Sequence, residues 1–408
     1  MKYTAAERTA CRVCGSDQLV RFLELPDMPL TDEFLREDEL GTEFMWPVRV
    51  YFCKHCCLTQ TLHNVNAEDY YQDYQYSVAL SPFAQRFMQR LAEEVWQRYQ
   101  FRSGDTVVEV GSSDGAQLAC FQTLGAKVFG FEPSAPLAQI ARNRGIPVAQ
   151  RLVTPQAAQD IPAGFLPTQV LLSTYTFDHL PDPMGFLTTV RRVLDPKRGV
   201  LILEVHDLEK IVERHEFCLF AHEHTTYYTA ATMQMVLRRA GFELISISLV
   251  PEVERRANSL LVAAVVQGSP LASRALPTLS LGALARADTY VAFGHVVQAS
   301  LLRLRELVQG KRQQGIRLAG YGAGGRGVMA LAVTAQPGDF AYVCDKNPVF
   351  HGLYTPGAHV LVDSPDRLLS DSVDQVIVFS FGYFREIYDD LVEFRARGGQ
   401  LISLLDLL

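Results

Sequence analysis

The sequence predicts an α/β protein in three parts: a small metal-binding domain, a doubly wound parallel sheet, and a second, smaller α/β domain. Three observations predict this arrangement. Two Cys-x-x-Cys pairs lie within the first 56 residues, strand and helix patterns alternate in two separate blocks, and each block contains a strand that runs into a glycine-rich turn.

Composition sets the limits of what the chain does. The 408 residues are 48% hydrophobic and 20% charged, which supports large cores and excludes global disorder. The net charge is −7, from 38 basic and 45 acidic residues, so we expect no nucleic-acid partner. No apolar run reaches the roughly 18 residues of a membrane span, and residues 1–10 lack the apolar core of a signal peptide. We therefore expect a cytoplasmic protein with no membrane partner, monomeric or in a small homo-oligomer.

The pattern along the chain divides it into a domain of residues 1–70, a domain of residues 71–267 and a domain of residues 284–408. A stretch rich in Pro, Ser and Ala at 268–283 separates the last two. Residues 284–314 read as one long helix.

The two cysteine pairs predict a zinc site. Pairs of Cys-x-x-Cys knuckles are the usual way to arrange four thiolates tetrahedrally around zinc, and four ligands leave no open position for catalysis. The predicted ligands are Cys11, Cys14, Cys53 and Cys56. Cys57 adjoins the second pair and is expected not to be a ligand. Unrelated thiols or a redox pair are the alternatives.

The middle block contains four expected strands, at 106–110, 127–131, 169–173 and 200–205. The first is an apolar run that ends at Gly111, as a buried parallel strand does before a turn into a helix. Alternation of such strands with helices predicts the doubly wound sheet.

The turn after the first strand predicts the cofactor. Its spacing is Glu-x-Gly-x-x-x-Gly rather than the dinucleotide fingerprint, and no basic residue is present to meet a pyrophosphate. Glu132, after the next strand, is placed to accept both hydroxyls of a ribose. A cationic cofactor without phosphates, S-adenosylmethionine (SAM), fits this pattern, while NAD or a turn without a ligand remain alternatives. The predicted cofactor residues are Glu109, Gly111, Asp114, Gly115, Glu132, Pro133 and Ser173.

The C-terminal block has its own glycine turn. It follows an apolar strand at 316–318 and precedes a helix at 328–333, so free backbone N–H groups form an anion site to which Arg326 adds charge. Asp345 follows the next strand, at 341–344, where a carboxylate can meet a ribose. The alternative is a Rossmann-like turn with no ligand. The predicted substrate-binding residues are Tyr321, Gly322, Arg326 and Asp345.

These features in this order resemble a known family. Zinc knuckles are followed by Val-Glu-Val-Gly-Ser-Ser-Asp-Gly at 108–115, His-Glu-His at 222–224 and Gly-Tyr-Gly-Ala at 320–323. Nearly the whole chain resembles the C-methyltransferases of nucleotide-linked deoxysugars, such as the C-3′-methyltransferase of the tetronitrose pathway. The resemblance implies a class I SAM methyltransferase fold with a C-terminal Rossmann-like domain. It also implies a dTDP-4-keto-deoxysugar substrate whose carbon next to the ketone is deprotonated and then methylated.

The resemblance also implies the catalytic residues. Tyr76, His179 and Glu223 match positions of the family's active site, and His224 matches the base. Histidine suits this role because its ordinary pKa of about 6.5 is close to working pH. Tyr76 or His179 is a candidate hydrogen-bond donor to the enolate oxygen. A loop position for His224 and simple packing for Tyr76 are the alternatives.

The chain departs from the family at three places. Ala221 stands where the family has Tyr, the 257–261 strand reads Ala-Asn-Ser-Leu-Leu with Asn258 in place of Gly, and Phe381-Gly382-Tyr383 replaces a Trp-Asn motif. We expect these residues to line or support the acceptor pocket. They keep open an O- or N-methyltransferase on another sugar or small metabolite. A zinc-knuckle methyltransferase acting on nucleic acid, or a binding module without activity, is disfavoured by the net charge.

Overall fold

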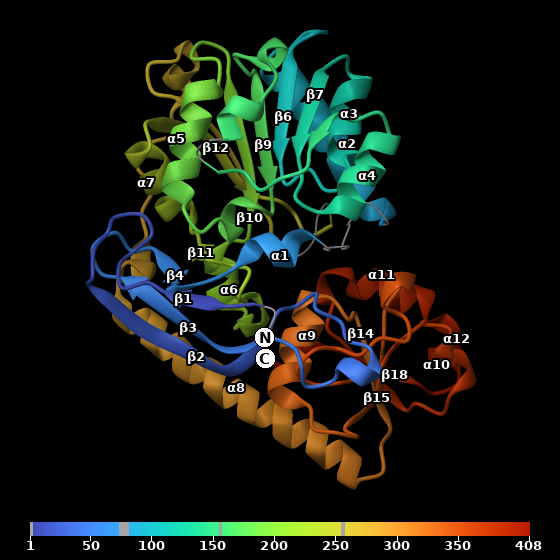
Figure 1. Ribbon diagram of the computed structural model, residues 1–408. Helices are drawn as coiled ribbons and strands as arrows, with labels where there is room; N and C mark the ends of the chain where they lie inside the picture. Colours follow the sequence, from blue (N-terminus) through green and yellow to red (C-terminus); the bar gives the residue numbers. More distant parts are fainter. Residues whose placement is uncertain (1–2, 73–80, 155–156, 254–257) are drawn as a thin grey trace.

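The computed structural model describes residues 3–72, 81–154, 157–253 and 258–408. Figure 1 shows a sheet flanked by helices at the top, the N-terminal strands lying on a long helix below it, and a C-terminal α/β domain beside them. Within the described residues, no helix combines the length and apolar character needed to cross a bilayer.

The N-terminal part is built from β-strands. They are β1 (Ala5–Glu7), β2 (Leu19–Pro29), β3 (Met45–Cys53), β4 (Thr59–Thr61) and β5 (His63–Val65), followed by helix α1 (Ala67–Gln72). The strand order of the main sheet is β11-β4-β3-β2, and β11 (Thr226–Tyr227) comes from the middle of the chain. In β3, Val48, Val50 and Phe52 are buried, because alternate residues of a strand face the same side.

The middle part forms the seven-stranded sheet. Its strands are β6 (Thr106–Val110), β7 (Lys127–Phe131), β8 (Val148–Ala149), β9 (Val170–Thr174), β10 (Val200–Val205), β12 (Phe242–Leu249) and β13 (Leu260–Val266). Its helices are α2 (Pro82–Arg98), α3 (Ala116–Thr123), α4 (Ala135–Asn143), α5 (Pro183–Val193), α6 (Leu208–Glu213) and α7 (Ala230–Arg239).

The sheet order is β12-β13-β10-β9-β6-β7-β8. In β6, Val107 packs in the core beneath α2, α3 and α4, whereas Val108 and Val110 pack beneath α5 and α7 on the other face. The doubly wound α/β class is therefore confirmed. The sheet is not wholly parallel, however, since β13 runs antiparallel to both β10 and β12. β12 and β13 are consecutive in the chain and neighbours in the sheet, and such a pair, with no crossover helix between its strands, is antiparallel.

Helix α8 (Ala287–Gln313) packs against the N-terminal strands and leads along the chain into the C-terminal domain. Its buried residues include Tyr290, Phe293, Val297, Leu301, Leu304 and Val308, at the spacing of one helix face. A Cβ at Gly294 would overlap the carbonyl oxygen of Phe22 in β2. Glycine at this position therefore lets the helix lie directly against the strand backbone.

The C-terminal domain has a five-stranded parallel sheet in the order β16-β15-β14-β17-β18. The strands are β14 (Leu318–Tyr321), β15 (Phe340–Cys344), β16 (Val362–Asp363), β17 (Gln375–Val378) and β18 (Gln400–Ser403). The helices are α9 (Gly325–Thr334), α10 (Arg367–Ser370), α11 (Phe384–Asp390) and α12 (Val392–Ala396). This is the predicted Rossmann-like arrangement, with the strand order reversing between β14 and β17.

The segment between the two cysteine pairs contacts the C-terminal domain. Its Phe34 ring stacks on Phe350 with centroids 4.2 Å apart. Leu35 and Tyr354 exchange backbone hydrogen bonds of 3.0 and 2.8 Å. The N-terminal part is thereby fixed to the C-terminal domain, and residues 31–32 come to lie between that domain and the seven-stranded sheet.

Candidate active site and zinc centre

A cavity of about 630 Å³ lies where the three parts of the chain meet. It opens at the carboxyl ends of β6, β7 and β9, the edge at which doubly wound sheets bind ligands, and extends to the turn before α9. We define its cofactor end by Glu109, Gly111, Asp114 and Glu132. We define its acceptor chamber by Asp32, His179, His206, Glu223, His224 and Arg326.

Gly111 shapes the cofactor end. It follows β6 with φ of +74°, and a Cβ at this position would overlap Oγ1 of Thr176. Both the left-handed backbone and the close approach require glycine. The turn therefore packs closely against Thr176 in the cavity wall and leaves room for a ligand.

Glu132 holds the neighbouring turns. Its two carboxylate oxygens accept hydrogen bonds of 2.8 Å from the backbone N–H groups of Ser113 and Ser134. Burial raises the pKa of Glu132 to about 7. The carboxylate retains lone pairs for a ligand, since each oxygen accepts more than one hydrogen bond.

Glu109 carries an unsatisfied acceptor. Its Oε2 atom is buried and has no hydrogen-bond partner among the described residues, while burial and the nearby Asp114 raise its pKa well above the ordinary value. Asp114 itself pairs with Arg144 at 3.0 Å. A buried acceptor without a donor favours a ligand that supplies one. The amino group and ribose hydroxyls of SAM are such donors.

Two predicted cofactor residues lie outside the cavity lining. Gly115 begins α3 with φ of +78°, and a Cβ there would lie 3.0 Å from that of Ala141, so it allows α3 to pack on α4. Ser173 is buried within β9. Thr174, the next residue, lines the cavity instead, because successive strand residues face opposite sides of the sheet. Pro133 lines the cavity beside Glu132.

His224 lies in the acceptor chamber with one nitrogen committed. Its Nδ1 lies 2.6 Å from the carbonyl oxygen of Leu219. A carbonyl only accepts, so Nδ1 carries the hydrogen and Nε2 of the neutral ring bears a lone pair. The ring of His224 packs against those of His179 and His206, with centroids 4.8 and 5.1 Å away.

Asp178 organises the other two histidines. Its Oδ2 lies 3.0 Å from Nδ1 of His206, and its Oδ1 lies 3.9 Å from Nε2 of His179. Burial raises the pKa of Asp178, but the hydrogen bond from His206 and the electrostatic effects of the three nearby histidines together outweigh it and hold the pKa well below the ordinary value. Burial lowers the pKa of His179 to about 4 and that of His206 to about 3, so both rings are neutral at neutral pH.

Glu223 faces away from its neighbour in sequence. Its Oε1 accepts hydrogen bonds of 2.7 and 2.9 Å from the backbone N–H and hydroxyl of Thr31 and lies 3.0 Å from the Tyr70 hydroxyl. Asp32 shares that hydroxyl at 3.2 Å, and burial together with Glu223 raises the pKa of Asp32 to about 7. The two carboxyls therefore form a pair in the acceptor chamber, whereas the Leu219 carbonyl, not Glu223, orients His224.

Arg326 marks the far end of the chamber. Its guanidinium carbon lies 4.9 Å from the centre of the Phe381 ring, and one nitrogen lies 3.5 Å from Oε2 of Glu216. The adjoining Gly325 faces Thr31, whose Oγ1 would be 3.6 Å from a Cβ at that glycine. The glycine turn of the C-terminal domain thus forms one wall of the chamber.

The other predicted substrate residues lie outside the cavity lining. Tyr321 is buried in β14, and Gly322 packs against Ser380. Asp345 accepts hydrogen bonds of 2.9 and 2.8 Å from the backbone of Ala323 and Asn347, so it holds the turn rather than facing the cavity. Tyr76 lies outside the residues that the structure describes.

The three departures from the family pattern have different places. Ala221 and Tyr383 line the cavity. Asn258 has φ of +73°, and its side chain hydrogen-bonds the backbone N–H and carbonyl of Asp207 at 2.5 and 3.1 Å. Its own carbonyl accepts a 3.4 Å hydrogen bond from Tyr175, which lines the cavity, so Asn258 supports the chamber from behind.

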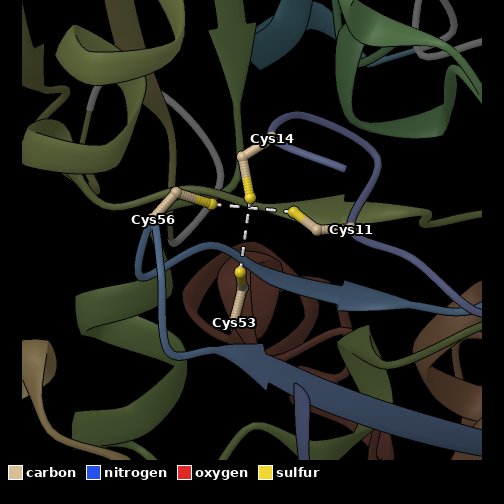
Figure 2. Close-up of side chains that lie close together, drawn as sticks. All are labelled: Cys11, Cys14, Cys53 and Cys56. Carbon is tan, nitrogen blue, oxygen red and sulfur yellow. Dashed lines mark hydrogen bonds between the residues drawn. The ribbon is translucent and has the colours of Figure 1, made fainter. Parts of the chain in front are cut away.

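The four predicted zinc ligands converge (Figure 2). Their sulfur atoms lie within 4.8 Å of one another, with Cys11–Cys56 and Cys14–Cys53 both at 3.6 Å. Thiolates about 2.3 Å from zinc in a tetrahedron lie roughly 3.8 Å apart, so the geometry fits the metal. Cys57 lies outside the group, and Cys120, Cys218 and Cys344 lie elsewhere in the fold.

Sequence reasoning missed Asp32, Tyr71, Asp178 and His206. His206 directly follows β10, so its place at the carboxyl edge of the sheet was a usable signal. Tyr71, whose hydroxyl lies 3.1 Å from Nδ1 of His179, and Asp32 have no local signal. They reach the cavity only because the N-terminal part docks on the middle and C-terminal domains.

Three family models match the chain in succession. Residues 11–71 match a domain described as zinc binding, residues 81–247 a methyltransferase domain, and residues 280–405 the C-terminal domain of C-methyltransferases. The chain is a SAM-dependent methyltransferase. The cofactor is accordingly SAM, and the four thiolates are placed to hold zinc.

The methyltransferase is similar to characterised proteins. It is 26% identical over 399 residues to the C-methyltransferase NovU of Streptomyces niveus, covering 96% of this chain and 94% of that protein. Among solved structures, it matches the SAM-bound magnesium protoporphyrin IX methyltransferase of Synechocystis PCC 6803 (14% identity, 48% of this chain, 88% of that chain, TM-score 0.34). It also matches a SAM-dependent methyltransferase of Aquifex aeolicus (18% identity, 47% and 100% of the chains, TM-score 0.34).

Proposed function

We propose that the enzyme methylates a carbon next to the ketone of a nucleotide-linked 4-keto-deoxysugar. One observation carries this proposal: His224 lines a cavity that runs from the cofactor end to Arg326, and its hydrogen bond to the Leu219 carbonyl occupies Nδ1 and leaves Nε2 to act as the base. The similarity to a C-methyltransferase supports carbon as the acceptor atom. Carbon methylation needs a base for the C–H proton, which a methyl donor alone does not provide.

In this mechanism, Nε2 of His224 takes the proton from the carbon next to the ketone. The C–H electron pair moves into the enolate, and the nucleophilic carbon then forms a bond to the methyl group as the sulfur–methyl bond breaks. SAM supplies that methyl group when bound. The hydrogen bond from Nδ1 to the Leu219 carbonyl holds the ring in this tautomer and supports the positive charge that develops on it.

His179 is the proposed donor to the enolate oxygen. Its low pKa keeps the ring neutral. With the Tyr71 hydroxyl donating to Nδ1, Nε2 carries the hydrogen. Oδ1 of Asp178, 3.9 Å from Nε2, is beyond hydrogen-bond distance, so this N–H can donate to an oxyanion. A neutral donor suits this task, since it stabilises the enolate without protonating it fully.

The glycine turn with Arg326 is the proposed site of the nucleotide diphosphate. The turn begins α9, a helix of 10 residues, and backbone N–H groups at a helix N-terminus favour anions. Arg326 adds a positive charge and is held by Phe381 and Glu216. In this arrangement Asp32 and Glu223 face the sugar and accept hydrogen bonds from its hydroxyls.

The test separates proton removal from methyl transfer. Wild-type enzyme with S-adenosylhomocysteine and a panel of dTDP-4-keto-deoxysugars in deuterated water should exchange the proton next to the ketone, measured by NMR. Replacing His224 with Asn removes the base at similar size. Exchange and turnover should fall by roughly 10²–10⁴-fold, the usual contribution of a general base, with S-adenosylhomocysteine affinity unchanged.

His222→Asn is the matched control. His222 is two residues away but faces the N-terminal part, where it lies 2.9 Å from the Met28 carbonyl and 2.8 Å from His63. Exchange that persists in His224→Asn would assign the base elsewhere, with His179 the next candidate. If wild-type enzyme methylates a sugar without any exchange, the acceptor atom is oxygen or nitrogen.

A further inference from the structure

Arg12 lies inside the first zinc knuckle, between two ligands. It is 5% exposed, and burial, helped by the charge of Arg8, lowers its pKa only to about 10, so it remains charged at neutral pH. Its backbone N–H donates a 2.8 Å hydrogen bond to Oε1 of Gln60, and Nε2 of Gln60 donates one of 3.0 Å to Sγ of Cys11. The position of Arg12 is therefore set by the zinc centre.

The guanidinium of Arg12 reaches well beyond the knuckle. Three hydrogen bonds go to the segment after the second cysteine pair: Nε to the Thr61 carbonyl at 3.0 Å, Nη2 to the His63 carbonyl at 2.7 Å, and Nη1 to Oδ1 of Asn64 at 2.6 Å. A fourth, of 3.0 Å, joins Nη1 to the carbonyl of Pro181 in the middle domain.

Pro181 ends the loop that carries His179. Residues 177–179 form a short 3-10 helix, and Leu180 and Pro181 line the cavity. Thr225 fixes the same loop from the other side, with its backbone N–H bonded to the Asp178 carbonyl at 2.9 Å and its hydroxyl to the Leu180 carbonyl at 2.7 Å. The loop is thus held between Arg12 and the segment that follows His224.

The zinc-bearing strands also hold the His224 segment. The backbone N–H of Thr61 donates a 3.1 Å hydrogen bond to the Thr225 carbonyl, and β4 pairs with β11 directly after it. Arg12 is bonded to Thr61 as well. One buried side chain therefore connects the zinc centre to both histidine-bearing segments of the acceptor chamber.

We propose that Arg12 is a positioning residue for the methyl transfer reaction: it transmits the rigidity of the zinc knuckle to the His179 loop and so fixes the acceptor chamber. Zinc then serves catalysis through this side chain as well as stabilising its own domain. The role depends on geometry that only a guanidinium provides, because its planar fork of five N–H donors serves four oxygen atoms at once. The inference rests on the proposed roles of His179 and His224.

Arg12→Lys tests the proposal, since lysine keeps the charge and the stem but presents a single nitrogen. We expect one zinc per chain and S-adenosylhomocysteine affinity within about twofold of wild type. Exchange of the sugar proton should fall by about 10–100-fold, the range for residues that orient an active site from behind. Hydrogen–deuterium exchange of the peptide 177–181 should become faster, while that of 106–116, which contains β6, should not change.

Arg49→Lys is the matched control. Arg49 lies in β3 of the same domain and pairs with Glu24 and Glu7 at 3.0 and 3.3 Å, outside the cavity lining. It should leave the sugar-proton exchange and the 177–181 peptide at wild-type values. An Arg12→Lys enzyme with wild-type exchange would overturn the proposal, as would equal loosening of 177–181 and 106–116.

Removal of zinc from wild-type protein with a chelator provides a test that needs no variant. Backbone exchange should rise at 11–14 and at 177–181 but not at 106–116. Unchanged protection at 177–181, or loss of protection at all three, would refute transmission through Arg12. This measurement requires no acceptor, so it distinguishes failure of this inference from failure of the proposed reaction.

Discussion

Replacing Gly111 with Ala tests how the turn after β6 shapes the cofactor end of the cavity. Two effects combine at this position. The residue has φ of +74°, and the added Cβ would overlap Oγ1 of Thr176 and lie 3.0 Å from its Cβ and Cγ2. Gly145→Ala is the matched control, because Gly145 has φ of +79° but no atom within 4 Å of the added Cβ, and it lies outside the cavity lining.

The magnitudes follow from this comparison. The left-handed backbone costs an Ala about 1–2 kcal/mol in either variant. Overlap with Thr176 adds about 1–3 kcal/mol at Gly111 alone, the range for overpacking. The turn relieves the overlap by moving away from Thr176 and into the cofactor end. Binding must restore the original position, so affinity for S-adenosylhomocysteine should fall by roughly 5–150-fold.

Calorimetry with S-adenosylhomocysteine and thermal denaturation separate the two effects. Gly145→Ala should lower Tm by a few degrees, about 2–4 °C per kcal/mol for a domain of this size, with unchanged affinity. Gly111→Ala should lower both. Adding Thr176→Ala removes Oγ1 and Cγ2 and should restore part of the affinity. If Gly111→Ala binds as tightly as Gly145→Ala, the close approach of the turn to Thr176 does not shape the site.

Three further predictions concern a buried carboxyl, a zinc ligand and the proposed substrate site. Burial and Glu223 raise the pKa of Asp32 from 3.8 to about 7, so its ionisation opposes folding increasingly between about pH 4 and pH 7. Asp32→Asn should therefore raise Tm more at about pH 8 than at about pH 4 in thermal denaturation scans. Equal shifts of Tm would contradict the burial of this carboxyl. Cys14→Ser should lose bound zinc, as measured by metal analysis. It should also destabilise the N-terminal part by several kcal/mol, because zinc binding is coupled to folding of such domains. Full zinc occupancy would exclude Cys14 as a ligand. Arg326→Lys should raise the KM for a dTDP-sugar about tenfold without changing S-adenosylhomocysteine affinity. The reason is that lysine loses both the stacking on Phe381 and the bidentate geometry for phosphate. An unchanged KM would remove Arg326 from the substrate site.

The sequence by itself determined the features that depend on neighbours along the chain. Apolar runs placed β6, β7 and β10 at their observed bounds, because a buried strand needs continuous apolar sequence. The spacing within each cysteine pair fixed the zinc ligands, since a knuckle is a local turn. The glycine turn and Glu132 predicted the cofactor end for the same reason: strand, turn and helix are consecutive.

Only the tertiary structure decided the acceptor chamber. Asp32 enters it from the N-terminal part, and Arg326 from a domain about 300 residues later, so no local pattern relates them. Glu223 and His224 are adjacent in sequence yet face different partners, because side-chain direction depends on the loop into which they fold. Contacts between distant segments form only when the separate cores dock, so no pattern among neighbouring residues predicts which side chains meet in the chamber.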